Sequence, residues 1–330
     1  MASGAGGEDA RRWRHEEFVA RAALIAHTAR LDAVAVNAFE AFRQAEVDAI
    51  LLKGPALARL LYRADEPRGY ADVDVLVSPA QRLAAGRVLS ELGFYNFSET
   101  RGVDDVGGVL HAEVWLGPVA AGHRRESIDL HWRLEGCQAP DTVVWEALSR
   151  DRGSIELAGA SIPTLGIPAS ALGVALHVAQ HGPADVKAMG DLRRALERWP
   201  LTIWRQAAEL ARELDGNEAF AAGLRLLPAG ARLADRLALP SAELALWDIA
   251  HRNSRPRGVF HVGALAQARS PGAKLDIVRR ALLPSRAWIR LEIGWARRSA
   301  IHLAGAYLVH ILRSPVWAAR ALRHRRRRPA

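Results

Sequence analysis

The sequence predicts an α+β protein in which a mixed sheet with flanking helices is followed by a mostly α-helical domain. Short apolar runs of strand length alternate with helical segments up to about residue 165, and after that point apolar residues recur mainly at helical spacing. Half of the 330 residues are hydrophobic, which is ordinary for a globular chain that buries a real core.

The first half of the chain alternates between the two periods. Residues 11–46 have apolar positions at helical spacing without an internal Pro or Gly, and predict one or two helices. A strand at 49–54, a helix at 55–62 that opens with Pro55, and a strand at 71–77 follow. Next come a helix closed by a glycine and three strand-like runs, at 79–94, 95–99, 108–116 and 127–134.

The second half predicts helices separated by Pro or Gly. A helix at 141–150 and a short hairpin at 154–165 precede it. Five helical segments follow, near 168–181, 184–198, 201–214, 217–227 and 241–252. We expect four parts: N-terminal helices that pack on the next domain (1–46), an α/β domain (47–165), a helical domain (166–285), and a basic amphipathic C-terminal segment with a tail (286–330).

Positive charge is concentrated at the C-terminal end. The formal net charge is +9, and residues 271–330 contain fourteen Lys or Arg against two acidic residues. This asymmetry suggests an anionic partner, either nucleic acid or membrane, but RHRRRRPA at 323–330 fits a solvated, disordered tail equally well. No nucleic-acid-binding motif is readable, so nucleic acid is not an expected partner.

The apolar segment 299–312 is shorter than the roughly 20 residues that a membrane-spanning helix needs. It fits a core or docking helix, or a helix lying at a membrane surface. Cys137 is the only cysteine, which excludes an intrachain disulfide and a CxxC site. The polar N-terminus has no apolar stretch of the secretory type. We therefore expect a cytoplasmic protein, associated with the inner face of the membrane if the basic segment contacts lipid.

Two aspartates interrupt a run that otherwise predicts a buried strand. In RGYADVDVLV (68–77), alternate side chains share a face, so the valines point one way and Asp72, Asp74 and Leu76 the other. Burying unpaired carboxylates is costly, so this face needs cations, strong donors or water. In the later strand, Asp129 shares a face with His131 and could meet the first two carboxylates. Three converging carboxylates suit Mg²⁺.

Three segments in this order carry a family resemblance: LLKG (51–54), RGYADVDVLV and SIDLHW (127–132). The chain resembles the nucleotidyltransferase superfamily that includes DNA polymerase β. It is more closely similar to a bacterial family of uncharacterised nucleotidyltransferases, over about residues 20–200. The resemblance implies a nucleotidyltransferase-like mixed sheet in the α/β domain.

The resemblance also implies roles for three carboxylates and a glycine. Asp72 and Asp74 would ligate two Mg²⁺ ions, for which Mn²⁺ could substitute. Asp129 would ligate the catalytic metal and activate the acceptor hydroxyl. Gly54 matches the glycine that lets nucleotide phosphates approach the backbone where a helix begins.

The chain departs from the superfamily pattern beside this glycine. Gly is usually followed by Ser there, whereas this chain has Lys53-Gly54-Pro55. Lys53 is therefore a candidate cation for the phosphates, although it also fits a solvated lysine at the end of a strand. Arg68 could serve the same phosphates or hold the loop.

The segment HVAQH places His177 and His181 four residues apart on one helical face, like a zinc pair. Val178 stands where the HExxH motif has Glu, and no third ligand is evident. The closer family has paired histidines and a later Asp-Leu, here Asp191-Leu192. His131, His177, His181 and Asp191 are therefore candidates for the acceptor or nucleotide-base side of the cleft, or for supporting the metal ligands.

The resemblance implies a Mg²⁺-dependent transferase that moves a nucleoside monophosphate from an NTP, such as ATP, to an acceptor and releases pyrophosphate. The acceptor would be a small molecule, a peptide or a protein. The alternative is a non-catalytic nucleotide- or partner-binding protein that keeps the fold and lies peripherally on the membrane. Mg²⁺-dependent NTP binding without turnover would favour this alternative.

Overall fold

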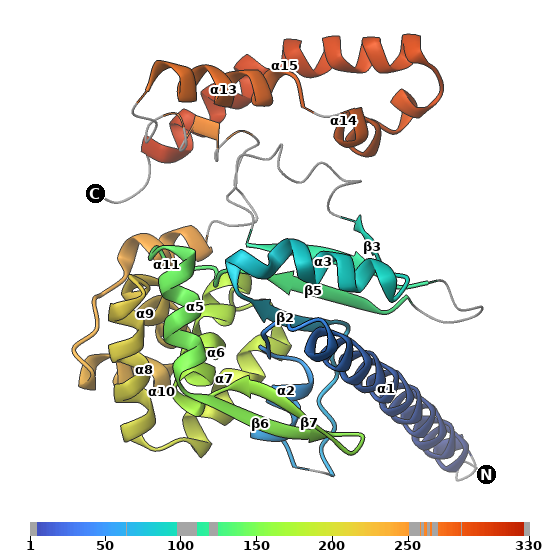
Figure 1. Ribbon diagram of the computed structural model, residues 1–330, viewed down its shortest axis with the longest axis vertical. Helices are drawn as coiled ribbons and strands as arrows, with labels where there is room; N and C mark the ends of the chain where they lie inside the picture. Colours follow the sequence, from blue (N-terminus) through green and yellow to red (C-terminus); the bar gives the residue numbers. More distant parts are fainter. Residues whose placement is uncertain are drawn as a thin grey trace.

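The structure is a computed structural model that describes residues 5–63, 65–97, 111–118, 125–250, 258, 261–262, 265, 270–284 and 286–326. The strand runs expected at 95–99 and 108–116 and the end of the helix expected at 241–252 lie partly outside these residues, as does half of the arginine-rich tail. Figure 1 confirms the predicted fold class: a mixed sheet with flanking helices, followed by a mostly helical half.

The described strands form one sheet: β1 (Ala49–Leu51), β2 (Val73–Val77), β3 (Tyr95–Asn96), β4 (Ala112–Leu116), β5 (Ser127–His131), β6 (Arg152–Leu157) and β7 (Ala160–Leu165). Their spatial order is β3-β4-β5-β2-β1-β7-β6. Strand β2 is parallel to β5 and antiparallel to β1, and β1 is parallel to β7. The predicted hairpin, β6-β7, thus extends the same sheet through β1.

One face of the sheet packs on α1 (Ala5–Gln44) and α3 (Arg82–Glu91). The three valines of β2 belong to this core, together with Phe42 of α1 and Leu89 of α3. A short 3₁₀ turn, η1 (Pro79–Gln81), leads into α3, and Gly93 ends this segment at a φ of +85°. Since a strand alternates its faces, the aspartate-bearing side of β2 points to the opposite layer.

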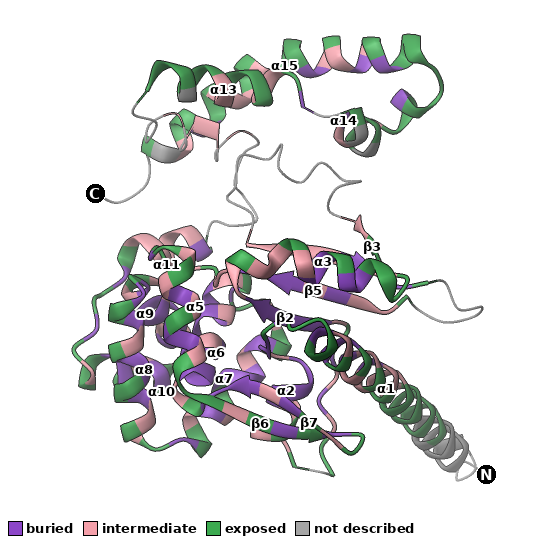
Figure 2. Cartoon of the chain, viewed as in Figure 1, coloured by how far each residue is buried: buried purple, intermediate pink, exposed green. Residues whose placement is uncertain are grey.

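The opposite layer contains α2 (Pro55–Leu61), α5 (Asp141–Arg150), α6 (Ile167–His181), α7 (Val186–Arg198), α8 (Leu201–Glu213), α9 (Asn217–Arg225), α10 (Pro228–Arg236) and α11 (Glu243–Ala250). Helix α10 lies in a stretch where the sequence predicted none. One core joins Ile50 and Leu76 of the sheet to Leu172 of α6 and Leu192 of α7. The helical half therefore packs directly on the sheet, and Figure 2 shows buried residues throughout this contact.

The C-terminal helices lie apart from the sheet in Figure 1. They are α13 (Pro271–Leu282), α14 (Arg286–Glu292), the 3₁₀ turn η4 (Gly294–Arg297) and α15 (Ala300–Arg326). Ile289, Ala296, Leu303 and Ala306 form a small core of their own. None of the helices in the described ranges is long and apolar enough to cross a membrane.

Candidate active site

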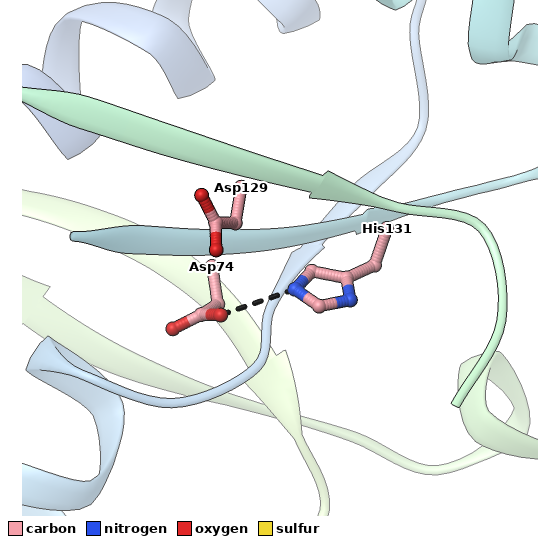
Figure 3. Close-up of side chains that lie close together, drawn as sticks. All are labelled: Asp74, Asp129 and His131. Atoms are coloured by element: carbon pink, nitrogen blue, oxygen red, sulfur yellow. Dashed lines mark hydrogen bonds and ion pairs between the residues drawn. The ribbon is translucent and has the colours of Figure 1, made fainter. Parts of the chain in front are cut away.

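Asp74 and Asp129 lie side by side on neighbouring parallel strands. They are register partners in the β2–β5 ladder, and the apolar neighbours Val73, Ile128 and Leu130 point to the α1–α3 core. Strand alternation therefore directs both carboxylates toward the helical half. Figure 3 shows Asp74, Asp129 and the His131 ring gathered on this side. The sequence predicted this shared face; the structure adds the register.

Asp74 is the best-paired member of the group. Only 1% of its side chain is exposed; Oδ1 lies 2.9 Å from Lys53 Nζ and 3.1 Å from His131 Nε2. Burial raises the pKa of Asp74, but the Lys53 charge and the His131 hydrogen bond outweigh burial and hold it well below its usual range. Asp74 is therefore a carboxylate at neutral pH.

Asp129 lies in the opposite electrostatic situation. Its carboxylate has no hydrogen bond or ion pair among the described residues. Burial, followed by repulsion from Asp74 and Asp72, raises its pKa to about 7 despite the nearby Lys53 charge. The two neighbouring carboxylates thus have pKa values displaced in opposite directions.

Asp72 precedes β2 and is partly buried. Burial and then the Asp74 charge raise its pKa, while Lys53 and Lys187 of α7 oppose the rise. Asp72 thus lies close enough to Asp74 and Lys53 for their charges to act on its carboxylate. It is not one of the three residues whose ligand atoms cluster most tightly.

Asp74, Asp129 and His131 could hold a metal ion, because their ligand atoms all lie within 4.8 Å of one another. Two carboxylates suit Mg²⁺ and Mn²⁺, and an imidazole nitrogen is also accepted by Mn²⁺. His131 Nδ1 is buried without a hydrogen-bond partner in the described part of the chain. His131 and Asp129 therefore both have ring-nitrogen or carboxylate lone pairs, unused by the described residues, that could bind a divalent cation.

Gly54 approaches the aspartate loop closely. Its φ is +63°, and a Cβ atom there would lie 3.2 Å from the Asp72 carbonyl oxygen. A side chain would therefore combine backbone strain with a tight contact. The requirement for glycine at this position is structural as well as a feature of the implied phosphate site.

Arg68 is paired with Asp191 rather than with the group formed by Asp74, Asp129 and His131. Arg68 Nε and Nη2 donate to the two Asp191 carboxylate oxygens at 2.8 and 2.6 Å, and Nη1 donates to the Gly54 carbonyl at 3.2 Å. The Tyr62 hydroxyl donates to Asp191 Oδ1 at 2.7 Å. Both side chains of the ion pair are almost completely buried. Of the two roles expected for Arg68, this geometry favours holding the loop.

A pocket that is partly open to solvent lies between Lys53 and α6. His131 lines it together with His177, which was predicted from sequence. Burial, then the Lys53 charge, lower the pKa of His177 to about 3, so its imidazole is neutral. The remaining lining includes His111, Leu134, Glu135, Ser170, Val174 and Gln180.

Two of the four residues predicted for the acceptor side, His181 and Asp191, lie outside this lining. The His181 ring is 4.3 Å from the His177 ring, and its Nδ1 is 3.6 Å from Asp185. Asp191 is occupied by Arg68. Conversely, sequence reasoning missed His111 and Glu135, whose side chains are 3.6 Å apart in the pocket wall. His111 lies inside the strand run predicted at 108–116 and Glu135 directly follows the run at 127–134, where single polar residues give little signal.

A family model described as uncharacterised nucleotidyltransferase matches residues 8–229 of the chain. No curated protein matches it significantly. Among solved structures, the antibiotic-resistance factor ANT(2'')-Ia in solution is 15% identical, with a TM-score of 0.38, over 55% of this chain and 91% of that one. A crystal structure of ANT(2'')-Ia in complex with adenylyl-2''-tobramycin is 16% identical, with a TM-score of 0.38, over 55% and 97%. An antigenic nucleotidyltransferase-like protein from Paracoccidioides brasiliensis is 12% identical, with a TM-score of 0.34, over 58% and 91%.

Proposed function

Because the chain belongs to this family of uncharacterised nucleotidyltransferases, we propose that it moves a nucleoside monophosphate from an NTP to an acceptor hydroxyl and releases pyrophosphate. The observation that supports the proposal best is the Asp74–Asp129 pair, because Asp74 contacts Lys53 and His131, two residues that line an open pocket. Burying two neighbouring carboxylates destabilises the folded state unless cations pair with them, and a metal ion would provide such a cation at a nucleotide site.

In the proposed reaction, the acceptor oxygen attacks the α-phosphorus of the NTP, and the bond from that phosphorus to the bridging oxygen of pyrophosphate breaks. Asp129 accepts the hydroxyl proton. Its carboxylate has no hydrogen bond or ion pair among the described residues, which leaves an oxygen to accept this proton. Pyrophosphate leaves with the electron pair of the broken bond, so atoms and charge balance.

Asp74, Asp129 and Asp72 would hold Mg²⁺, with His131 as a fourth donor or as the group that orients Asp74 through its 3.1 Å contact. Bound Mg²⁺ would supply positive charge that neutralises the carboxylates and stabilises the phosphate oxygens. Lys53, which neutralises Asp74 in this structure, would be released toward the polyphosphate when a cation takes over that carboxylate.

The pocket beside α6 is the proposed acceptor site. Its wall combines the neutral His177 imidazole, the Glu135 carboxylate and apolar side chains such as Leu134 and Val174. Apart from Lys53 and the histidines, its lining contains no basic side chain. Such a surface favours a polar acceptor that is not strongly anionic, and leaves the triphosphate to the side of Lys53 and Gly54.

The test is transfer of label from each α-³²P-labelled NTP, with Mg²⁺, to fractions of a cell extract. We expect one nucleotide to label an acceptor and Asp74→Asn to abolish the labelling. Asp235→Asn is the matched control, because Asp235 of α10 is exposed and paired with Arg225 far from the pocket. Labelling that survives Asp74→Asn, or falls equally in the control, would contradict the proposal. Saturable NTP binding without transfer would assign the fold to nucleotide binding alone.

A further inference from the structure

Helix α15 has two apolar faces, and only one of them is covered. Leu303, Ala306 and His310 are buried against the other C-terminal elements, and Ala321 is buried on the same face. The opposite face exposes large apolar residues, each with 51% or more of its surface accessible: Ile301, Leu308, Leu312, Val316 and Leu322. Figure 2 shows the exposed side running along the outer edge of the helix.

The positions of these residues make one continuous strip. Ile301, Leu308, Leu312 and Val316 are separated by seven, four and four positions, which places them on one side of an α-helix. Ile311 and Leu322 border the same side and are also exposed. Scattered exposed leucines need no explanation, but a strip of this length marks an interaction surface.

The charges beside the strip select its partner. Helix α15 contains no Asp or Glu in its 27 residues, and Arg313, Arg320 and Arg323 are exposed along it. Residues 271–330 contain fourteen basic residues and only two acidic ones. A helix with a long apolar face, whose charged residues are all basic, suits the interface of an anionic bilayer, where the apolar side enters the acyl boundary and the arginines reach phosphates.

We infer that the outer face of α15 docks on the surface of an anionic phospholipid bilayer. The helix lies in the plane of the interface, since no described helix can cross the membrane. The separate position of α13–α15 in Figure 1 leaves the candidate active site on another part of the molecule. This surface is independent of the proposed transfer reaction.

The test is flotation of the full chain with phosphatidylcholine vesicles and with vesicles that also contain phosphatidylglycerol. We expect binding to the anionic vesicles, weakened by salt, and little binding to phosphatidylcholine alone. Leu308→Glu with Leu312→Glu should weaken binding by at least about tenfold. Arg313→Gln with Arg320→Gln should weaken only the charge-dependent part.

The matched control is Ile25→Glu with Leu83→Glu, which adds the same charge at exposed apolar positions of α1 and α3. Circular dichroism should show that all variants are folded, and the control should bind vesicles like the unchanged chain. Absence of binding to anionic vesicles, or equal loss in the control, would overturn the inference. A dimer that the Leu308/Leu312 pair dissociates, or RNA binding without vesicle binding, would assign the face to another partner and also overturn it.

Discussion

Asp74 and Asp129 face each other across the β2–β5 ladder, yet their pKa values are displaced in opposite directions. Lys53 and His131 contact Asp74, whereas no described side chain pairs with Asp129. The site therefore contains one neutralised carboxylate and one whose charge is costly. A divalent cation would remove this difference, because it can be shared by both carboxylates.

Metal binding should stabilise the protein more in mild alkali than in mild acid. The folded pKa of Asp129, about 7, lies above its usual value of 3.8. The folded state therefore holds this proton more tightly, so the contribution of Asp129 to stability falls as pH rises between these values. Mg²⁺ or Mn²⁺ should raise the Tm clearly near about pH 8 and little near about pH 5, as measured by differential scanning fluorimetry.

Asp129→Asn is the matched variant for that measurement. It removes the repulsion, so the metal-free Tm near about pH 8 should rise and the response to metal should shrink. An equal metal-induced shift at both pH values, or an unchanged response in Asp129→Asn, would show that the cation binds elsewhere.

The Arg68–Asp191 pair should contribute strongly to folding. Asp191→Asn leaves the buried Arg68 guanidinium without a counter-charge and replaces one of its two acceptor oxygens by an amide donor, which costs about 3–5 kcal/mol. Glu213→Gln is the control, because it breaks the exposed Arg150–Glu213 pair and should cost less than about 1 kcal/mol. Urea unfolding measures both. Similar losses in the two variants would contradict the structural role assigned to Arg68.

Gly54→Ala should impair both stability and nucleotide binding. The positive φ and the 3.2 Å approach to the Asp72 carbonyl oxygen cost about 1–3 kcal/mol when a Cβ is added. Because Gly54 also accepts a hydrogen bond from Arg68, a shift of this loop would move Lys53 away from Asp74. Calorimetric titration with Mg²⁺ and NTP reports the binding. Gly272→Ala is the control, since its added Cβ meets nothing within 4 Å. If the Gly54→Ala variant is as stable as the unchanged chain and binds Mg²⁺ and NTP equally well, the role assigned to this glycine is wrong.

The sequence predicted the face of each aspartate, because strand alternation depends only on local spacing. It also predicted most helices and the hairpin, whose first strand begins at Arg152 rather than at the expected Ser154. The register that sets Asp74 opposite Asp129, and the joining of β7 to β1, depend on long-range packing that periodicity does not encode. Helix α10 was missed because its nine residues include Pro228 and Gly230, which weaken the helical pattern.

Arg68 illustrates a second limit of sequence reasoning. Its place four residues before Asp72 made it a candidate for phosphate binding, but its partner Asp191 is 123 positions away. The contact between His111 and Glu135 has a similar origin, since it joins the residue before β4 to the segment after β5, and these two strands pair in the sheet. Local motifs located the charged centre, and tertiary packing selected its surroundings.

The central claim is that Asp74 and Asp129 serve nucleotidyl transfer, and the most direct measurement is release of pyrophosphate from each NTP in the presence of Mg²⁺ and acceptor-containing extract. Asp74→Asn and Asp129→Asn should each lower the rate by at least about a hundredfold, because each removes charge at the reacting centre. The control Asp235→Asn should keep the rate of the unchanged chain. Equal rates in all four proteins would contradict the claim.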